Sequence, residues 1–326
     1  MTMLYDADID DPLRGERIAV LGFGAQGRAQ ALNLRDAGLD VVVGLRDGSA
    51  SAAKARGDGL AVATPEAAAA AAAVIAFLIP DAQQPAVYRS LEPRVRRGAA
   101  LVFAHGFTVH YGQLAARADL DVILVAPLGV GDQVRAQHQA GGGVPALVAV
   151  HQDASGRARA RALGYAKALG CARAGVIESS FREEVETDLF AEQAVLCGGL
   201  THLVTAAFDT LVDAGYSPEV AYFCCLHEVK LLADLMHARG IAGMRESISF
   251  TAEHGDYTRG PRVIGAPTRE AMRGILAEVQ SGAYARELGQ ELAAGTPVVE
   301  AGRAAARAQL IEQVGARLRA RMPWLK

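Results

Sequence analysis

Glycines at a short, fixed spacing form the first candidate binding site in this sequence. Gly22-Phe23-Gly24-Ala25-Gln26-Gly27 fits the pattern G-x-G-x-x-G. It directly follows the apolar run 18–21 and opens a stretch rich in Ala, Leu and Arg, which is typical of a helix. Such a turn lets the backbone approach a pyrophosphate, and the free amides of the helix N-terminus bind it. A purely structural turn is the alternative, but the strand–turn–helix context favours a dinucleotide site.

A cation stands after the next apolar run, 41–44, where an NAD site usually has an acidic residue. Arg46 occupies that place, and the hydroxyl groups of Ser49 and Ser51 follow it. A guanidinium with hydroxyl donors suits a 2′-phosphate dianion. Asp47 argues against this interpretation, and a solvated loop charge is the alternative for Arg46. The sequence favours NADPH over NADH.

Two carboxylates lie four residues apart in the second half of the chain. Asp188 and Glu192 fall on a predicted helix, so both project from one face. Such a pair suits hard cations that prefer oxygen ligands. Taken alone, this spacing is usually just a solvated acidic face of a helix.

The elements that position these residues follow from the hydrophobic pattern. Between residues 17 and 177, short apolar runs alternate with helical stretches, which predicts a Rossmann-type, doubly wound parallel sheet. After residue 180 only helical periods continue, with Leu189, Gln193, Leu196 and Leu200 on one predicted face. We therefore expect an α/β domain over 1–181 and an all-α domain over 182–326. The predicted strands are 18–21, 41–44, 74–78, 101–103, 122–125, 146–150 and 174–177.

Composition narrows the class of protein. The 326 residues carry a formal net charge of −3, which offers no electrostatic reason to bind nucleic acid or an anionic membrane. The acidic start lacks the layout of a signal peptide, and the longest apolar run, 67–79, is too short to span a bilayer. The four cysteines lack CxxC spacing and suit a reducing compartment. These features predict a soluble, cytoplasmic protein. The cysteines are Cys171, Cys197, Cys224 and Cys225.

Longer stretches, in order along nearly the whole chain, resemble ketol-acid reductoisomerase (acetohydroxyacid isomeroreductase) of the short class. The general ones are 18–27, Pro80-Asp81, Phe103-Ala104-His105-Gly106-Phe107, Gly143-Val144-Pro145-Ala146-Leu147 and Ala149-Val150-His151-Gln152-Asp153. The most specific ones are Glu186-Thr187-Asp188-Leu189-Phe190-Ala191-Glu192-Gln193, Leu196-Cys197-Gly198-Gly199, Leu226-His227-Glu228 and Thr251-Ala252-Glu253-His254-Gly255-Asp256.

This resemblance implies an activity and an assembly. In that family a 2-acetohydroxy acid undergoes a Mg²⁺-dependent alkyl shift. NADPH then reduces the resulting 2-keto acid to a 2,3-dihydroxy acid, in valine and isoleucine synthesis. The resemblance further implies a knotted, dimer-forming helical domain, two Mg²⁺ ions between the domains, and an active site that takes ligands from two subunits of a homodimer.

The resemblance also implies roles for individual residues. Asp188 would bridge both Mg²⁺ ions, Glu192 would complete the first site, and Glu228 would bind the second ion. His105 would be catalytic, and Ser249 would contact the substrate carboxylate. The cofactor contacts beyond the glycine turn would include Asp81, Gln84 and Gly131.

Several positions depart from the family pattern. Leu128 stands where the family has a lysine, and a leucine cannot bond a carboxylate or a substrate oxygen. Cys224 replaces a glutamate ligand, and a thiol is a poor ligand for Mg²⁺. Cys224 is then either a small buried apolar residue or, less simply, a thiolate ligand to a softer metal. The remaining departures are Val130 for proline, Asp132 for histidine and Phe250 for a short polar residue.

Losing a lysine and a glutamate together partly preserves the charge balance of such a site, which suggests coordinated change. Three functions stay open at this point. The chain is an authentic ketol-acid reductoisomerase, a diverged NADPH-dependent reductase or isomerase for another small 2-oxo acid or imine, or a non-enzymatic NADPH-binding protein. The surviving acidic residues favour the two enzymes over the third alternative.

Overall fold

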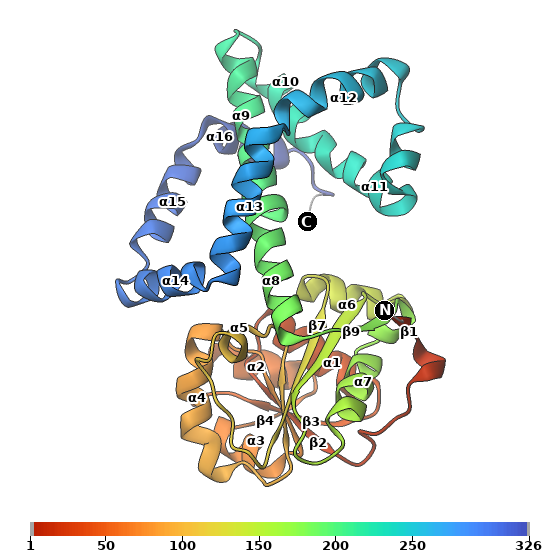
Figure 1. Ribbon diagram of the computed structural model, residues 1–326, viewed down its shortest axis with the longest axis vertical. Helices are drawn as coiled ribbons and strands as arrows, with labels where there is room; N and C mark the ends of the chain where they lie inside the picture. The colour runs from red at the N-terminus through yellow and green to blue at the C-terminus, as the bar shows by residue number, and fades with distance from the viewer. Residues whose placement is uncertain (1–2, 325–326) are drawn as a thin grey trace. The chain divides into compact units, whose positions relative to one another are not determined.

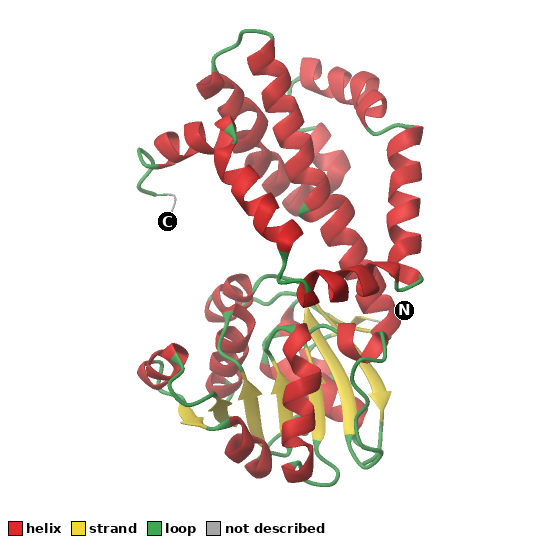
Figure 2. Ribbon diagram, turned by 90° about the vertical axis from the view of Figure 1, so that its left-hand side faces the viewer, coloured by secondary structure: helices red, strands yellow, loops and turns green. Residues whose placement is uncertain are grey.

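The computed structural model describes residues 3–324. The chain divides into two compact units, Met1–Thr187 and Asp188–Lys326. The first unit contains a nine-stranded sheet between helices, and the second is built from helices (Figures 1 and 2). This arrangement confirms the predicted fold class, a Rossmann-type sheet followed by an all-α region.

The sheet of the N-terminal unit has the strand order β1-β9-β8-β7-β6-β5-β2-β3-β4. Neighbouring strands from β4 through β7 all pair in parallel, whereas β8 runs antiparallel to β7 and β1 antiparallel to β9. The strands are β1 (Met3–Leu4), β2 (Arg17–Leu21), β3 (Asp40–Gly44), β4 (Ala61–Ala63), β5 (Val74–Phe77), β6 (Ala100–Phe103), β7 (Asp121–Pro127), β8 (Ala146–Gln152) and β9 (Val176–Glu178).

Helices cover both faces of this sheet, as its unbroken apolar strands require. Side chains of α1, α2 and α7 pack into one core, and those of α3 and α4 pack into another on the opposite face. The helices are α1 (Ala25–Asp36), α2 (Ala50–Gly57), α3 (Pro65–Ala71), α4 (Gln84–Leu91), α5 (Phe107–His110), α6 (Gly131–Gln139) and α7 (Ala158–Ala168). Short 3₁₀ turns are η1 (Asp6–Asp8), η2 (Asp81–Gln83), η3 (Glu92–Arg94) and η4 (Cys171–Arg173).

All seven predicted strands are present, and two short ones, β1 and β4, were not predicted. β1 has only two residues and β4 has two alanines among its three, so neither carries a clear strand-like hydrophobic pattern. The antiparallel direction of β8 was also unforeseen, because an apolar run has the same pattern in either direction. The order of strands reverses between β2 and β5, which is where open sheets of this kind bind ligands at the carboxyl ends of their strands.

The C-terminal unit is helical, and no strand follows β9 within the described residues. Its core gathers buried side chains from helices far apart in the sequence, Val204, Phe208, Ala221, Tyr222, Ile311 and Val314. Helix α8 (Phe181–Ala191) begins in the first unit and leads into the second. The following α-helices are α9 (Gly198–Asp213), α10 (Pro218–Tyr222), α11 (Glu228–Arg245), α12 (Phe250–Val263), α13 (Ala266–Gln280), α14 (Ala283–Ala293), α15 (Pro297–Ala308) and α16 (Leu310–Arg319).

Two π-helical turns interrupt the helices of this unit, η5 (Glu192–Leu196) after α8 and η6 (Phe223–His227) after α10. The first turn overturns the predicted common face of Leu189 and Leu196. Leu189 is buried, whereas Leu196 is 61% exposed. A π turn inserts one residue into the helical register, so side chains that follow it rotate away from the face set before it.

One helical run within the described residues, Phe181–Asp213, is long and apolar enough to cross a membrane by length and composition alone. This run was not foreseen, because the longest unbroken apolar segment lies elsewhere. Val204 and Phe208 on it belong to the core of the C-terminal unit, which accounts for part of its apolar character. A single run of this kind is weak evidence for a membrane span.

Candidate active site

The glycine turn lies between β2 and α1, at the carboxyl edge of the sheet. Gly22 has φ +97°, and a Cβ there would lie 2.4 Å from the carbonyl oxygen of Leu78. A Cβ on Gly27 would lie 2.5 Å from the carbonyl oxygen of Gly22. Gly24, in contrast, faces open space, with no heavy atom within 4 Å of a Cβ. Two glycines therefore allow the turn to close, and the third leaves room beside the amides of α1 that a pyrophosphate fits.

The side chain of Gln26 is already used by the protein. Its Nε2 donates to the carbonyl oxygen of Gly129 at 2.8 Å, and its Oε1 accepts from Nε2 of Gln30 at 3.1 Å. Gln30 also accepts a hydrogen bond from the buried hydroxyl of Tyr165 at 3.0 Å. Gln26 therefore connects the glycine turn to the loop after β7, and these two bonds use one of the two N–H donors and one of the two acceptor lone pairs of its amide.

Helix α6 begins directly against the glycine turn. A Cβ on Gly131 would lie 2.3 Å from the carbonyl carbon of Ala25 and 2.7 Å from the amide nitrogen of Gln26. Only glycine fits this place, and the N-termini of α1 and α6 converge there. The two helix dipoles add at this point, which suits a negatively charged group.

Two of the three predicted 2′-phosphate residues lie in the loop after β3, which lines a hollow of about 460 Å³ with α2 and the end of β4. Arg46 and Ser49 line this hollow, together with Asp47. Ser51 is half-buried and is not among its lining residues. The role of Ser51 as a cofactor contact stays a prediction.

A buried polar contact at this edge joins His105, which follows β6, to Glu184 of α8. His105 Nδ1 lies 2.8 Å from Oε1 of Glu184, and the backbone amide of Gly106 donates to Oε2 at 2.9 Å. The carboxylate is only 3% exposed, and the imidazole is half-buried. A Cβ on Gly106 would lie 2.8 Å from the ring of Phe181, so glycine is what lets α8 approach this closely. The carboxylate fixes both the orientation of the imidazole and which nitrogen carries its proton.

Glu184 was missed by the sequence reasoning, although a signal was present. Glu184, Asp188 and Glu192 repeat at intervals of four, so they follow one another along successive turns of a helix. A carboxylate oxygen of Glu184 lies within 4.8 Å of a ring nitrogen of His105. It also lies within 4.8 Å of a carboxylate oxygen of Asp188, one turn further along α8. The acidic face therefore begins one turn earlier than predicted.

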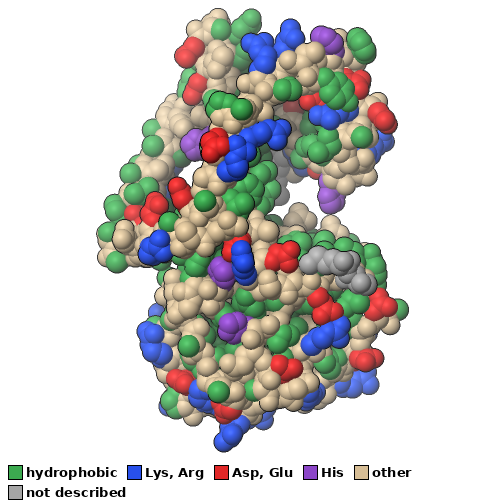
Figure 3. All heavy atoms as spheres, in the orientation of Figure 1, with side chains coloured by type: hydrophobic (Ala, Val, Ile, Leu, Met, Phe, Trp, Pro, Cys, Tyr) green, Lys and Arg blue, Asp and Glu red, His purple; other side chains and the backbone are tan. Residues whose placement is uncertain are grey.

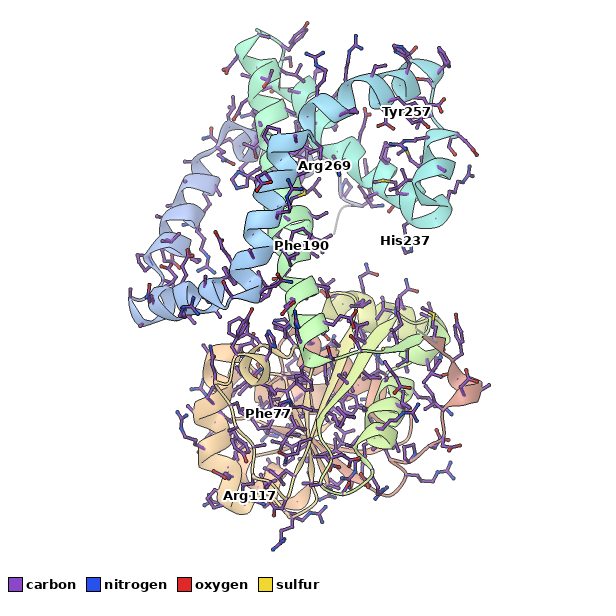
Figure 4. All side chains as sticks on the ribbon, in the orientation of Figure 1. Phe77, Arg117, Phe190, His237, Tyr257 and Arg269 are labelled. Carbon is purple, nitrogen blue, oxygen red and sulfur yellow. The ribbon has the colours of Figure 1, made fainter. Side chains whose placement is uncertain are left out.

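A second polar group lies beyond β5. Asp81 and Gln84 share a hydrogen bond of 3.0 Å, and Thr108 donates to Oε1 of Gln84 at 2.7 Å. Burial raises the pKa of Asp81, since a charged carboxylate loses its hydration there. The ring of Phe77 at the end of β5, which is labelled in Figure 4, stacks on that of Phe103 at the end of β6 with centroids 5.4 Å apart. The stacked rings and the polar group at Asp81 and Gln84 therefore follow from the ends of the same two adjacent strands.

The first two predicted metal ligands lie before and at the first π-helical turn. Asp188 is half-buried on α8, and Glu192 is exposed at the first position of η5. The side-chain nitrogen of Gln193, the next residue, is buried without a hydrogen-bond partner within residues 3–324. Oxygen donors of this kind fit Mg²⁺. Single π turns occur often at functional sites, which agrees with their place here.

The second ligand helix has a different donor set. Glu228 is exposed at the start of α11, and Cys224 is exposed within η6. The interpretation of Cys224 as a small buried residue is therefore wrong for the single chain. Its neighbour Cys225 packs against the core beside Tyr222, and this turns Cys224 outward. Glu228 fits a hard cation, whereas the thiol does not.

The remaining departures from the family pattern lie on exposed segments. Leu128 and Val130, after β7, are 49% and 69% exposed, and Asp132 lies in the first turn of α6. Ser249 caps α12 by accepting from the amide of Ala252 at 3.3 Å, which leaves its hydroxyl proton to donate. Phe250, at the start of the same helix, is 81% exposed.

Comparison with known proteins decides the family. Residues 12–175 match the domain described as "Acetohydroxy acid isomeroreductase, NADPH-binding domain". Residues 181–324 match "Ketol-acid reductoisomerase, C-terminal domain". The chain belongs to the ketol-acid reductoisomerase family. It is an oxidoreductase with a nicotinamide-cofactor domain, and the predicted resemblance is confirmed.

Solved structures agree with this assignment. The chain is 43% identical to an NADH-preferring ketol-acid reductoisomerase from an uncultured archaeon, with a TM-score of 0.96 over 98% of this chain and 99% of the other. A putative oxidoreductase from Jannaschia sp. is 17% identical, with a TM-score of 0.60 over 82% of this chain and 97% of the other. A semialdehyde dehydrogenase NAD-binding protein from Cupriavidus necator is 18% identical, with a TM-score of 0.61 over 82% and 99%. The last two share the fold alone.

Proposed function

We propose that this protein is a Mg²⁺-dependent ketol-acid reductoisomerase that uses NADPH to act on a small 2-acetohydroxy acid. The observation that carries the proposal is the His105–Glu184 pair at the carboxyl edge of the sheet. His105 follows β6, which neighbours β5, and β5 in turn neighbours β2. The pair therefore lies on the same carboxyl edge of the sheet as the glycine turn after β2. A proton-transfer group and a nucleotide-binding turn on one edge of a sheet suit a reductase.

Within this proposal the chain's own residues bind, orient and move protons. Glu184 accepts from Nδ1 of His105, which assigns the proton of the neutral ring to Nδ1 and makes Nε2 the basic nitrogen. His105 then serves as the proton donor or acceptor of the reaction. Ser249 donates its hydroxyl to a substrate carboxylate, and the amides of the glycine turn bind the pyrophosphate of the cofactor.

Mg²⁺ would be held first by Asp188 and Glu192, whose carboxylates are the oxygen donors it prefers. Bound there, it would supply Lewis acidity that polarises the substrate carbonyl and hydroxyl. Glu228 fits a second ion, but Cys224 does not supply the second carboxylate that this site would need. We infer one well-formed Mg²⁺ site and a weaker second one.

The choice of NADPH rests on Arg46 and Ser49 beside the end of β3. The archaeal relative named above prefers NADH, and Asp47 lies directly beside Arg46. NADH is therefore the competing cofactor, and the test is to measure the KM of the purified enzyme for NADPH and for NADH. A lower KM for NADH than for NADPH would overturn this part of the proposal.

A homodimer in the cytoplasm is also part of the proposal. Val195, Leu196, Leu200 and Leu203 follow one another along η5 and α9, and each is between 40% and 61% exposed in the single chain. Figure 3 shows hydrophobic side chains on the visible face of the helical unit. Adjacent exposed apolar residues mark an interaction surface, and a second copy of the same chain fits it. Sedimentation of the purified protein tests this, and a monomer at micromolar concentration would contradict it.

A second candidate is a diverged reductase that has lost the alkyl shift, and the exposed Leu128 and Cys224 favour it. The shift requires more charge stabilisation than hydride transfer to a 2-oxo acid does. The test is NADPH oxidation with Mg²⁺, offered 2-acetolactate and, separately, 3-hydroxy-3-methyl-2-oxobutanoate. Turnover of both supports the reductoisomerase. Turnover of only the second compound supports the diverged reductase, and turnover of neither contradicts both.

A further inference from the structure

The hollow beside the end of β3 has a second guanidinium in its wall that the motif at residues 46–51 does not include. Arg56 of α2 lines it opposite the loop that carries Arg46. We infer that Arg56 determines the preference for a 2′-phosphorylated cofactor. This inference rests on the proposed use of NADPH and names the residue on which that preference depends.

Arg56 reaches the hollow because of its place on α2. Ala52, Ala53 and Arg56 share one face of this helix and all line the same hollow. Ala55 is fully buried against the sheet, so it sets the helix orientation. Lys54 faces elsewhere and lines another hollow, of about 290 Å³, at the glycine turn with Gly24 and Arg28. Two cations of one short helix are thus directed to different places.

Neither Arg46 nor Arg56 has a side-chain hydrogen bond or an ion pair within the described part of the chain. Other arginines of the same unit are paired. Arg28 Nε lies 2.7 Å from the carboxylate of Asp58, and Arg135 lies 2.6 Å from that of Asp36. Guanidiniums that face a common hollow without an acceptor are positioned for an anionic ligand.

Charge in the hollow makes Arg56 the deciding residue. The formal charges of Arg46 and the adjacent Asp47 sum to zero, so the loop alone gives the hollow no net positive charge. Arg56 adds the one uncompensated positive charge. A 2′-phosphate responds strongly to that charge, whereas the neutral 2′-hydroxyl of NADH does not. The selectivity for phosphate therefore depends on α2 more than on the loop.

Hydroxyl donors complete the site. Ser49 is the N-cap residue of α2, yet its side chain makes no capping hydrogen bond, so its hydroxyl is available. Thr64 accepts from the amide of Ala67 at 3.3 Å and keeps its proton to donate. With the two arginines, these groups supply several donors to the three terminal oxygens of a phosphate.

The test compares Arg56→Gln with Lys54→Gln in the full-length enzyme. Both remove one positive charge from the same helix, but only Arg56 lines the hollow. Fluorescence titration measures the Kd of NADPH, NADH, adenosine 2′,5′-bisphosphate and AMP, and thermal unfolding without ligand checks the fold. For Arg56→Gln we expect Kd to rise about tenfold for both 2′-phosphorylated ligands and less than twofold for NADH and AMP. Lys54→Gln should leave the ratio of the two classes unchanged, and Arg56→Lys should recover part of the loss.

Two results would overturn the inference without touching the proposed function. One is a wild-type preference for NADPH that survives Arg56→Gln. The other is an equal change in both variants of the ratio between the Kd values of the 2′-phosphorylated and the unphosphorylated ligands, which would indicate only the general field of the protein. A wild-type enzyme that binds NADH more tightly than NADPH would instead remove the proposed cofactor, and this inference with it. Adenosine 2′,5′-bisphosphate and AMP cannot transfer a hydride, so their Kd values report binding alone. The result therefore does not depend on turnover.

Discussion

Replacing Glu184 by Gln is the sharpest test of how the His105–Glu184 pair works. Glutamine has nearly the same shape, and its Oε1 can still accept from the amide of Gly106. Its NH₂ then faces Nδ1 of His105, where the carboxylate oxygen stood at 2.8 Å. An amide donates to Nδ1 and moves the ring proton to Nε2, so the basic nitrogen is lost.

The size of the effect follows from the bond that is removed. A hydrogen bond to a buried charged group contributes about 1.5–3 kcal/mol, which corresponds to roughly 10- to 150-fold in rate. The upper half of that range applies, because the change also reverses the tautomer of His105. Stability should fall by no more than about 1 kcal/mol, since the contact to Gly106 is retained.

The assay is kcat/KM for NADPH oxidation with 3-hydroxy-3-methyl-2-oxobutanoate, measured across pH. The matched control is Glu183→Gln, one residue earlier on α8. The carboxylate of Glu183 is exposed and, within residues 3–324, accepts only from the hydroxyl of Ser179, at 2.6 Å, so its loss should change the rate less than twofold. Glu184→Asp keeps the charge and should give an intermediate rate. The reasoning is refuted if Glu184→Gln keeps a rate within twofold of wild type, or if the control loses as much.

Three further outcomes follow. Gly24→Ala should leave the unfolding temperature unchanged but raise the Kd of NADPH at least tenfold. Gly27→Ala should destabilise the protein, because its Cβ, unlike that of Gly24→Ala, would lie 2.5 Å from a backbone oxygen. Equal unfolding temperatures of the two variants would contradict this. Leu128→Lys with Cys224→Glu should increase turnover of 2-acetolactate, and no gain would locate the limit elsewhere. The hydrogen bond from Arg28 lowers the pKa of the Asp58 carboxyl below 3.8. This ion pair stabilises the folded protein by at most about 1 kcal/mol above that pH, and the stabilisation is lost as the pH falls through the lowered pKa. The difference in unfolding free energy between wild type and Asp58→Asn should therefore vanish in acid, and a constant difference would show that the ion pair is not its cause.

Local patterns in the sequence were sufficient for the main elements. Continuous apolar runs of three to five residues that alternate with helical stretches are typical of strands in a covered parallel sheet, so β2, β3, β5, β6 and β7 were predictable. Only glycine permits the closures at Gly22 and Gly27, so the nucleotide turn was predictable as well. The spacing of Asp188 and Glu192 placed both carboxylates on one helical face. Each of these depends on residues close together in the chain.

Features that depend on the meeting of distant segments were decided by the tertiary structure. Glu184 contacts His105 across 79 positions, and Gln26 reaches Gly129 across 103. Arg56 acquires its neighbours from the packing of α2 beside β4. The π turn at Glu192 shifted the helical faces that a regular period predicts. In each case the partner depends on how elements cross in space, because a side chain's own sequence neighbourhood does not specify what packs against it.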